Sequence, residues 1–226
     1  MKPVPVPRAL QSDEIKQVVE QFYNAAELAR EAGFDGVEIH GANGYLLDQF
    51  LRDGSNLRED EYGGSLANRL RVPLEVVAAV AQVFALDQIG YRISPNNPFH
   101  GMADSDPVNT FSELTQRLDE IGIGYLHIFE YLKGHEYGPT DEQTVMTPLL
   151  RKLFKNTYIV NGGYLKESAE SALATGQADM VAFGVPFLAN PDLPERFLQN
   201  AKLNDPDRDT FYQGEAKGYT DYPTLT

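Results

Sequence analysis

The residues best suited to chemistry lie in one short stretch, His40-Gly41-Ala42-Asn43-Gly44-Tyr45. His40 ends a short β-rich segment, and Asn43 and Tyr45 follow on the next loop and first turn. A neutral imidazole and an amide can both donate hydrogen bonds to one carbonyl or nitro oxygen and so polarise it. A nearby tyrosine hydroxyl, whose pKa is high, can then protonate a carbanion-like carbon. The structural alternative is that His40 is a satisfied strand-end residue and Tyr45 a packed aromatic.

A second candidate is Arg92, within the otherwise apolar segment Gly90-Tyr91-Arg92-Ile93. Burying an unpaired cation costs free energy, so this side chain must point into the polar opening of a barrel or pair with another group. It suits an electron-rich ring or an anion that gains charge during a reaction. The alternative is a structural salt bridge with an acidic neighbour.

Glycines follow two late β-rich segments, in Asn161-Gly162-Gly163 and in Phe183-Gly184. Without side chains, such positions let backbone N–H groups come close to a phosphate. A Gly-Gly pair also serves simply as a turn, so this signal is weak by itself.

The other polar side chains do not indicate a metal site. His100, His127 and His135 lack the spacing of metal ligands, and the acidic run Glu59 to Glu61 is typical of a solvated loop. The chain has no cysteine, which excludes disulfides, thiolate nucleophiles, cysteine-ligated zinc and iron–sulfur clusters. We therefore expect no metal, and a cytoplasmic protein.

Composition narrows the classes of partner. The 226 residues include 19 basic and 33 acidic ones, a formal net charge of −14. That charge repels phosphate backbones and anionic lipid headgroups. No apolar run approaches the roughly 20 residues that span a bilayer. We expect a small-molecule substrate, no nucleic acid and no membrane.

The elements that must position these residues form a repeated couplet of helix and strand. After a proline-rich leader over residues 1–8, predicted to be extended, a helix capped by Ser12 ends at Gly33. Predicted strands cover residues 34–40, 89–95, 124–128, 157–163 and 179–184. Predicted helices precede them over 66–84, 109–121, 147–154 and 166–175, and a last helix begins near Asn190-Pro191-Asp192. Short apolar strands alternating with helices indicate an α/β fold with a covered parallel sheet, in a single domain over residues 1–226.

The number of strands leaves two architectures open. An open flavodoxin-like sheet uses five strands, whereas a closed (β/α)₈ TIM barrel uses eight in roughly 250 residues. Polar and glycine-rich loops follow the strand ends, and the phosphate-type glycines follow the last two strands. Both features favour a barrel that lacks about its first three strands.

These stretches together resemble the old yellow enzyme family of FMN-dependent ene-reductases, most closely its N-ethylmaleimide and nitroester reductase branch. The resemblance extends nearly end to end and preserves the order of the motifs, which makes it more specific than any one motif. The matching stretches are residues 34–40, 43–51, 60–65, Asn68-Arg69, 92–95, 189–193 and 218–223.

The resemblance implies FMN at the carboxyl face of a barrel and a role for each candidate residue. The residues matching His40 and Asn43 hydrogen-bond the substrate's activating oxygen, and the one matching Tyr45 delivers a proton to Cα. Arg92 would lie at the flavin N1 and O2 edge, where negative charge grows on reduction. Backbone groups of Gly162, Gly163 and Gly184 would meet the phosphate, and Tyr212 would line the substrate pocket.

Two departures from the family pattern accompany the resemblance. The family's chain is longer on its N-terminal side, so we expect this chain to need a complementary N-terminal segment or a homo-oligomer. The family also has an arginine after the glycine of the last strand, where this chain has Val185. Losing that contact to phosphate removes about 1.5–3 kcal/mol.

The sequence thus predicts an ene-reductase that passes hydride from NAD(P)H through FMN to α,β-unsaturated carbonyl or nitro compounds. The alternative is a non-catalytic half-barrel remnant or scaffold that has lost FMN. An unrelated phosphate-binding aldolase is disfavoured, because no lysine follows a strand.

Overall fold

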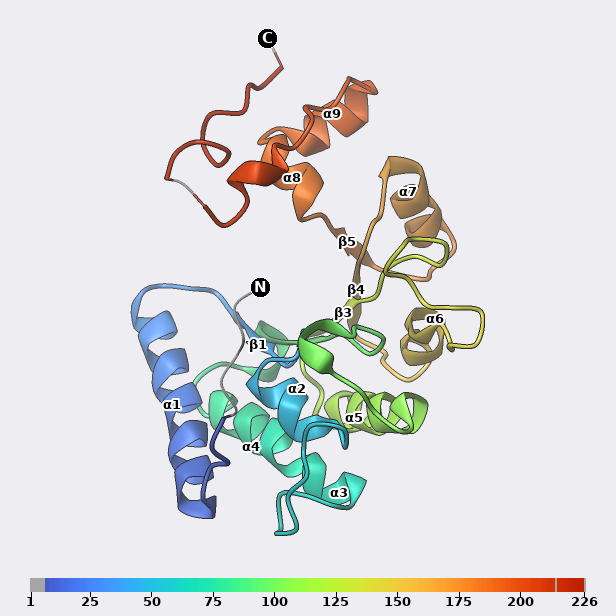
Figure 1. The fold of residues 1–226 in the computed structure, drawn as a ribbon. Coiled ribbons are helices and arrows are strands. Elements are labelled where there is room, and N and C mark those ends of the chain that lie inside the picture. Colours follow the sequence, from blue (N-terminus) through green and yellow to red (C-terminus); the bar gives the residue numbers. More distant parts are fainter. Residues whose placement is uncertain (1–6, 214, 226) are drawn as a thin grey trace.

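A single parallel sheet organises the chain in the computed structural model, which describes residues 7–213 and 215–225 (Figure 1). The leader predicted over residues 1–8 therefore lies mostly outside the described residues. Neighbouring strands in the sheet follow chain order, β1-β2-β3-β4-β5, and every pair is parallel. The strands are β1 (Val37–His40), β2 (Ile89–Ile93), β3 (Tyr125–Phe129), β4 (Thr157–Asn161) and β5 (Met180–Ala182).

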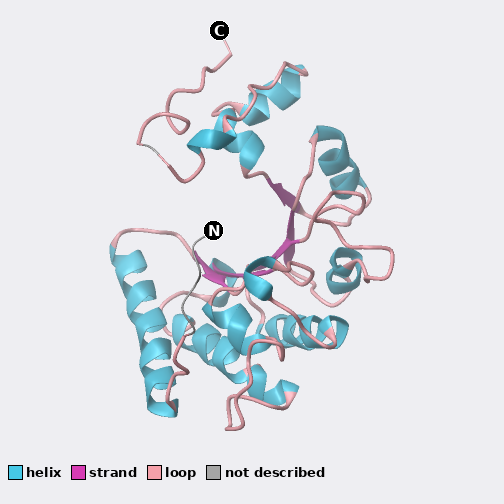
Figure 2. Ribbon diagram, in the orientation of Figure 1, coloured by secondary structure: helices cyan, strands magenta, loops and turns pink. Residues whose placement is uncertain are grey.

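The helices connecting the strands lie along one side of the sheet, which curves away from them (Figure 2). A flavodoxin-like sheet has the order 2-1-3-4-5 and helices on both faces, whereas a barrel winds one way with its helices outside. The order and the curvature therefore identify a partial (β/α)₈ barrel. The helices are α1 (Ser12–Glu31), α2 (Leu46–Leu51), α3 (Leu66–Arg69), α4 (Arg71–Val80), α5 (Pro107–Ile121), α6 (Met146–Arg151), α7 (Lys166–Ala174), α8 (Val185–Ala189) and α9 (Leu193–Gln199), with 3-10 turns η1 (Leu86–Gln88), η2 (Phe99–Gly101) and η3 (Arg208–Thr210).

Helix boundaries differ from the sequence prediction at their caps. The N-cap of α1 is Gln11, one residue before Ser12, because the Glu14 carboxylate accepts a hydrogen bond from the Gln11 backbone N–H at 2.7 Å. The helix predicted over residues 66–84 divides into α3 and α4. The last helix begins after Asp192 rather than Asn190, whose side chain is buried and bonds the backbone of residues 186 and 204.

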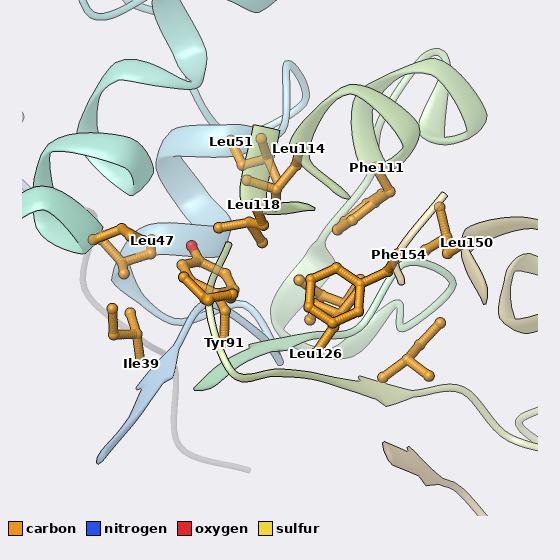
Figure 3. Close-up of a cluster of buried hydrophobic side chains, with 14 of the residues drawn as sticks. Ile39, Leu47, Leu51, Tyr91, Phe111, Leu114, Leu118, Leu126, Leu150 and Phe154 are labelled. Carbon is orange, nitrogen blue, oxygen red and sulfur yellow. The ribbon is translucent and has the colours of Figure 1, made fainter. Parts of the chain in front are cut away.

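The hydrophobic core fills the space between the sheet and the helices (Figure 3). Strand residues Ile39, Tyr91 and Leu126 point toward the helices, where they meet side chains such as Leu47 and Leu118. Each such side chain contributes about 1.5–3 kcal/mol by leaving water. This core, on the convex face of the sheet, holds the strands in register and so fixes the positions of the residues at their carboxyl ends.

The opposite, concave face of the sheet is largely polar. Alternate strand residues point to it, since successive side chains in a strand face opposite sides. On β1 and β2 the residues of this face are charged, histidine or glycine, whereas apolar side chains appear from the end of β3 onward, at Phe129, Ile159 and Met180, of which Met180 is 55% exposed. The concave residues are Glu38, His40, Gly90, Arg92, Tyr125, His127, Phe129, Thr157, Ile159, Asn161, Met180 and Ala182.

Across the described residues, none of the helices combines the length and the apolar composition that a membrane crossing requires.

Candidate active site

His40 and Arg92 lie side by side at the carboxyl ends of β1 and β2. They are partners in the strand register, so their side chains share the concave face. Partial burial and the positive charge of Arg92 lower the pKa of His40 below its usual value. The imidazole is therefore neutral near pH 7, with one nitrogen able to donate a hydrogen bond and the other to accept one.

The loop between β1 and α2 brings Asn43 and Tyr45 to His40. The ring centroids of Tyr45 and His40 are 5.4 Å apart, and His100 packs edge-on against Tyr45 at the same distance. Tyr45 is 55% exposed, which leaves it accessible to a small molecule. Asn43 has a φ of +59°, a left-handed conformation that asparagine tolerates, held by a hydrogen bond from its N–H to Ser94 Oγ at 2.7 Å.

Arg92 faces the concave side with part of its hydrogen-bonding capacity unused. Its Nη2 donates to Asn161 Oδ1 at 3.3 Å, and its guanidinium lies 5.4 Å from the centroid of the Phe129 ring. Its buried Nε has no partner among the described residues. Burial lowers the pKa of Arg92, an effect that Glu38 partly offsets, yet an arginine stays charged at any physiological pH. This arrangement suits a group that brings its own acceptor and negative charge.

A carboxylate–imidazole pair shares the concave face with Arg92, on the two strands that flank β2. His127 Nδ1 and Glu38 Oε2 are 3.0 Å apart, across the strand that carries Arg92. Burial opposes ionisation of Glu38, but the hydrogen bond and charge of His127 outweigh it, with help from Arg92 and Tyr125, and hold the pKa of Glu38 below its usual value. Burial, reinforced by Glu38, raises the pKa of Tyr125 to about 12. Glu38 is thus a fixed negative charge supporting Arg92.

The predicted phosphate glycines follow β4 and β5 and so lie at the same edge of the sheet. Gly162 has a φ of +132°, and a Cβ there would come within 2.2 Å of the Glu130 carbonyl, so packing alone requires glycine. At Gly184, by contrast, a Cβ would meet nothing within 4 Å. Close backbone packing thus explains why position 162 is glycine. At position 184 no neighbouring atom requires glycine, and the space beside its Cα is open. Val185, which begins α8, is 37% exposed and offers no charge.

Tyr212 lies apart from this group. Its side chain is 96% exposed, and its backbone N–H donates to the Tyr219 hydroxyl at 2.9 Å. That hydrogen bond joins Tyr212 to another residue of the C-terminal segment itself. The structure therefore brings His40, Asn43, Tyr45 and Arg92 together, and leaves Tyr212 outside that cluster.

Several residues of this site were missed by sequence reasoning. Ser94 and Asn97 hold Asn43 from the loop after β2, and Asn161 from β4 accepts from Arg92. The missed signal is a run of serine and asparagines directly after a buried strand, where barrel sites form. The loop after β3 also gathers aromatic rings, with Tyr131 and His135 stacked at 4.2 Å.

The family model described as NADH:flavin oxidoreductase / NADH oxidase matches residues 1–204 of the chain. The chain belongs to this family. Among proteins of this flavin oxidoreductase family, 12-oxophytodienoate reductase 1 of Oryza sativa subsp. japonica is 48% identical over 221 residues, which are 97% of this chain and 58% of that protein. Putative 12-oxophytodienoate reductase 5 of the same plant is 49% identical, over 97% of this chain and 59% of its own length.

Solved structures of this flavin oxidoreductase family are similar to nearly the whole of this chain. Morphinone reductase superposes with a TM-score of 0.93 at 46% identity, covering 99% of this chain and 59% of that one. The old yellow enzyme homologue from Zymomonas mobilis gives a TM-score of 0.95 at 42% identity, covering 99% and 63%. The resemblance to the old yellow enzyme family and the partial TIM barrel are thereby confirmed. The chain spans about 60% of the length of these relatives.

Proposed function

We propose that this chain is the catalytic C-terminal portion of an FMN-dependent ene-reductase acting on α,β-unsaturated carbonyl or nitro compounds. One observation supports this most: the carboxyl edge of the sheet brings together His40, Asn43, Tyr45 and Arg92, in a chain that belongs to a family of flavin oxidoreductases. A morphinone reductase of similar fold was solved in complex with tetrahydroNAD, which favours a nicotinamide reductant, NADH or NADPH.

The ring end of FMN fits the residues present. Arg92 offers an unpartnered buried Nε and a charged guanidinium on the concave face, which match the N1 and O2 edge of a flavin. When bound, FMN would accept hydride from NAD(P)H and return it to the β-carbon of the substrate. Arg92 would stabilise the negative charge that the reduced ring gains.

His40 and Asn43 would bind and polarise the substrate. Each can donate a hydrogen bond to its carbonyl or nitro oxygen, where negative charge develops as hydride arrives at the β-carbon. Tyr45, next to His40 and open to solvent, would give its hydroxyl proton to Cα. Tyr212, on the C-terminal segment, would line the substrate pocket.

At the phosphate end of FMN we propose contacts from the backbone of Gly162, Gly163 and Gly184. Restoring a cation there should strengthen binding. Val185→Arg is expected to tighten FMN binding about 10- to 100-fold, because a charge-assisted contact to phosphate contributes about 1.5–3 kcal/mol. Fluorescence titration with FMN and with riboflavin measures the effect.

Riboflavin, which has no phosphate, is expected to bind Val185→Arg and the parent chain equally. Val185→Gln is the matched control, since it adds length without charge and should leave FMN affinity near the parent value. An equal gain for riboflavin would disprove a phosphate contact.

We further propose that the barrel is completed by a complementary N-terminal segment. Within the described residues, β1 and β5 are the two edges of the sheet, and unpaired edges are ready to pair with further strands. The concave face also holds a buried polar atom, His127 Nε2, which has no partner among the described residues and which the flavin contacts proposed above do not use. Both features indicate that other polypeptide covers this face in the active protein, and a homo-oligomer is the other arrangement that could do so.

The test of the proposed function is flavin retention with and without that segment. We expect the chain mixed with the N-terminal portion of a relative to keep flavin absorbance after desalting, and the chain alone to lose most of it. Size-exclusion chromatography should show the two polypeptides eluting together. A stable, active, flavin-loaded monomer would overturn the need for a complement.

The second candidate function is a non-catalytic half-barrel remnant or scaffold without FMN. Val185 and the open sheet favour it. Absence of flavin binding in the complemented protein, with Val185→Arg giving no gain, would support the remnant and contradict the reductase.

A further inference from the structure

A chain of hydrogen bonds with a defined direction leads to the Asn43 amide. The Phe99 backbone N–H donates to Asn97 Oδ1 at 3.0 Å, and Asn97 Nδ2 donates to Asn43 Oδ1 at 2.7 Å. Asn97 is buried in the loop after β2, and neither of its bonds is used by the mechanism described above.

The backbone N–H of Phe99 sets the direction of this series of hydrogen bonds. An asparagine amide can turn by 180° and exchange its oxygen with its nitrogen, so a bond between two such amides has no direction of its own. The backbone N–H of Phe99, however, can only donate. Asn97 must therefore offer Oδ1 to Phe99 and Nδ2 to Asn43, and Asn43 must accept through Oδ1. Its Nδ2 is left as the donor available to the site.

The backbone of Asn43 is fixed independently of its side chain. Its N–H donates to Ser94 Oγ at 2.7 Å, and its carbonyl oxygen lies 2.9 Å from His100 Nδ1. With the main chain anchored at both ends in a left-handed conformation, rotation of the side-chain amide is the remaining freedom. Asn97 is the described residue that bonds that amide.

We propose that Asn97 is a positioning residue which makes Asn43 a hydrogen-bond donor toward the substrate oxygen. This inference rests on the proposed function for the role of Asn43, but the orientation itself does not. Without this orientation, an amide oxygen would face the substrate oxygen, and the two acceptors would repel each other.

Asn97→Asp tests the proposal, because it changes one atom group and keeps the bond to Phe99. The new carboxylate still accepts from the Phe99 N–H but now presents an acceptor to Asn43. The Asn43 amide is expected to turn, so that its Nδ2 donates to the carboxylate. In ¹H–¹⁵N spectra of the chain, the Asn43 side-chain amide signals, identified by their loss in Asn43→Asp, should move downfield.

The matched control is Asn109→Asp, which makes the same change at an exposed position of α5 and should leave these signals in place. Unmoved Asn43 signals in Asn97→Asp would overturn the proposal.

Kinetics of the flavin-loaded protein give the second readout. Asn97→Asp should lower kcat/KM for an unsaturated ketone about 10²- to 10³-fold, as loss of an oxyanion donor does, while the rate of flavin reduction by NAD(P)H stays the same. Asn97→Ala should cost less, because it leaves Asn43 free to turn either way. In an Asn43→Ala background, Asn97→Asp should add no further loss.

The order of the two Asn97 variants distinguishes a positioning role of Asn97 from a purely structural one. A purely structural role predicts the opposite order, with Asn97→Ala more harmful than Asn97→Asp, because only the alanine loses the bond to Phe99; that order would overturn the proposal. Moved Asn43 signals with unchanged kinetics would support the orientation and contradict the role of Asn43 in substrate binding, which is part of the proposed function.

Discussion

Tyr45→Phe is expected to slow the transfer from reduced flavin to an activated alkene about 10²- to 10⁴-fold, the usual range for a lost general acid. The phenyl ring keeps the packing between His40 and His100, whose rings each lie 5.4 Å from that of Tyr45. Only the proton donor is removed. Reduction of the flavin by NAD(P)H needs no proton from Tyr45 and should stay nearly unchanged.

Stopped-flow absorbance of the flavin-loaded protein measures the two half-reactions separately. Tyr137→Phe is the matched control, since Tyr137 is a similarly exposed tyrosine whose ring packs on Phe99 and Tyr131. It should leave both rates close to the parent values. Equal losses in the two half-reactions of Tyr45→Phe would indicate a general defect and count against the role as proton donor.

Arg52→Ala is expected to lower the free energy of unfolding by about 3–5 kcal/mol, because it leaves a carboxylate buried without its partner. The Asp48 and Arg52 side chains are 0% and 3% exposed, and Arg52 Nε lies 2.8 Å from Asp48 Oδ1. Arg52 also donates to the carbonyl oxygens of Ser94 at 2.5 Å and Pro95 at 3.1 Å. The Asp48 carboxylate accepts from the Gly44 N–H at 2.9 Å.

This ion pair therefore joins the loop that carries Asn43 and Tyr45 to the loop after β2. Urea unfolding followed by circular dichroism gives the change in stability. Arg117→Ala is the matched control: Arg117 pairs with Glu113 and Glu120 on the exposed face of α5, and its loss should cost less than about 1 kcal/mol. A loss below 1 kcal/mol for Arg52→Ala would show that water or a local shift satisfies Asp48.

The candidate active site could be predicted from the family motifs because the residues of each motif are close together in the sequence. His40, Asn43 and Tyr45 lie within six residues of one another, so a strand end followed by a loop brings them together in any α/β fold. Arg92 was predictable for a different reason, since a cation in an apolar strand must find a polar face. Their catalytic roles remain proposals.

The sequence by itself determined the α/β class, the positions of the five strands and the glycines after β4 and β5, because hydrophobic periodicity and glycine act over a few residues. Only the tertiary structure decided that the helices cover one face, that the concave face is polar, and that Asn97 directs the Asn43 amide. Those features depend on contacts between residues tens of positions apart, such as Asn43 with Asn97 and Glu38 with His127. Such pairs meet only when strand register and curvature are set by the packed core, so no local pattern in the chain encodes them.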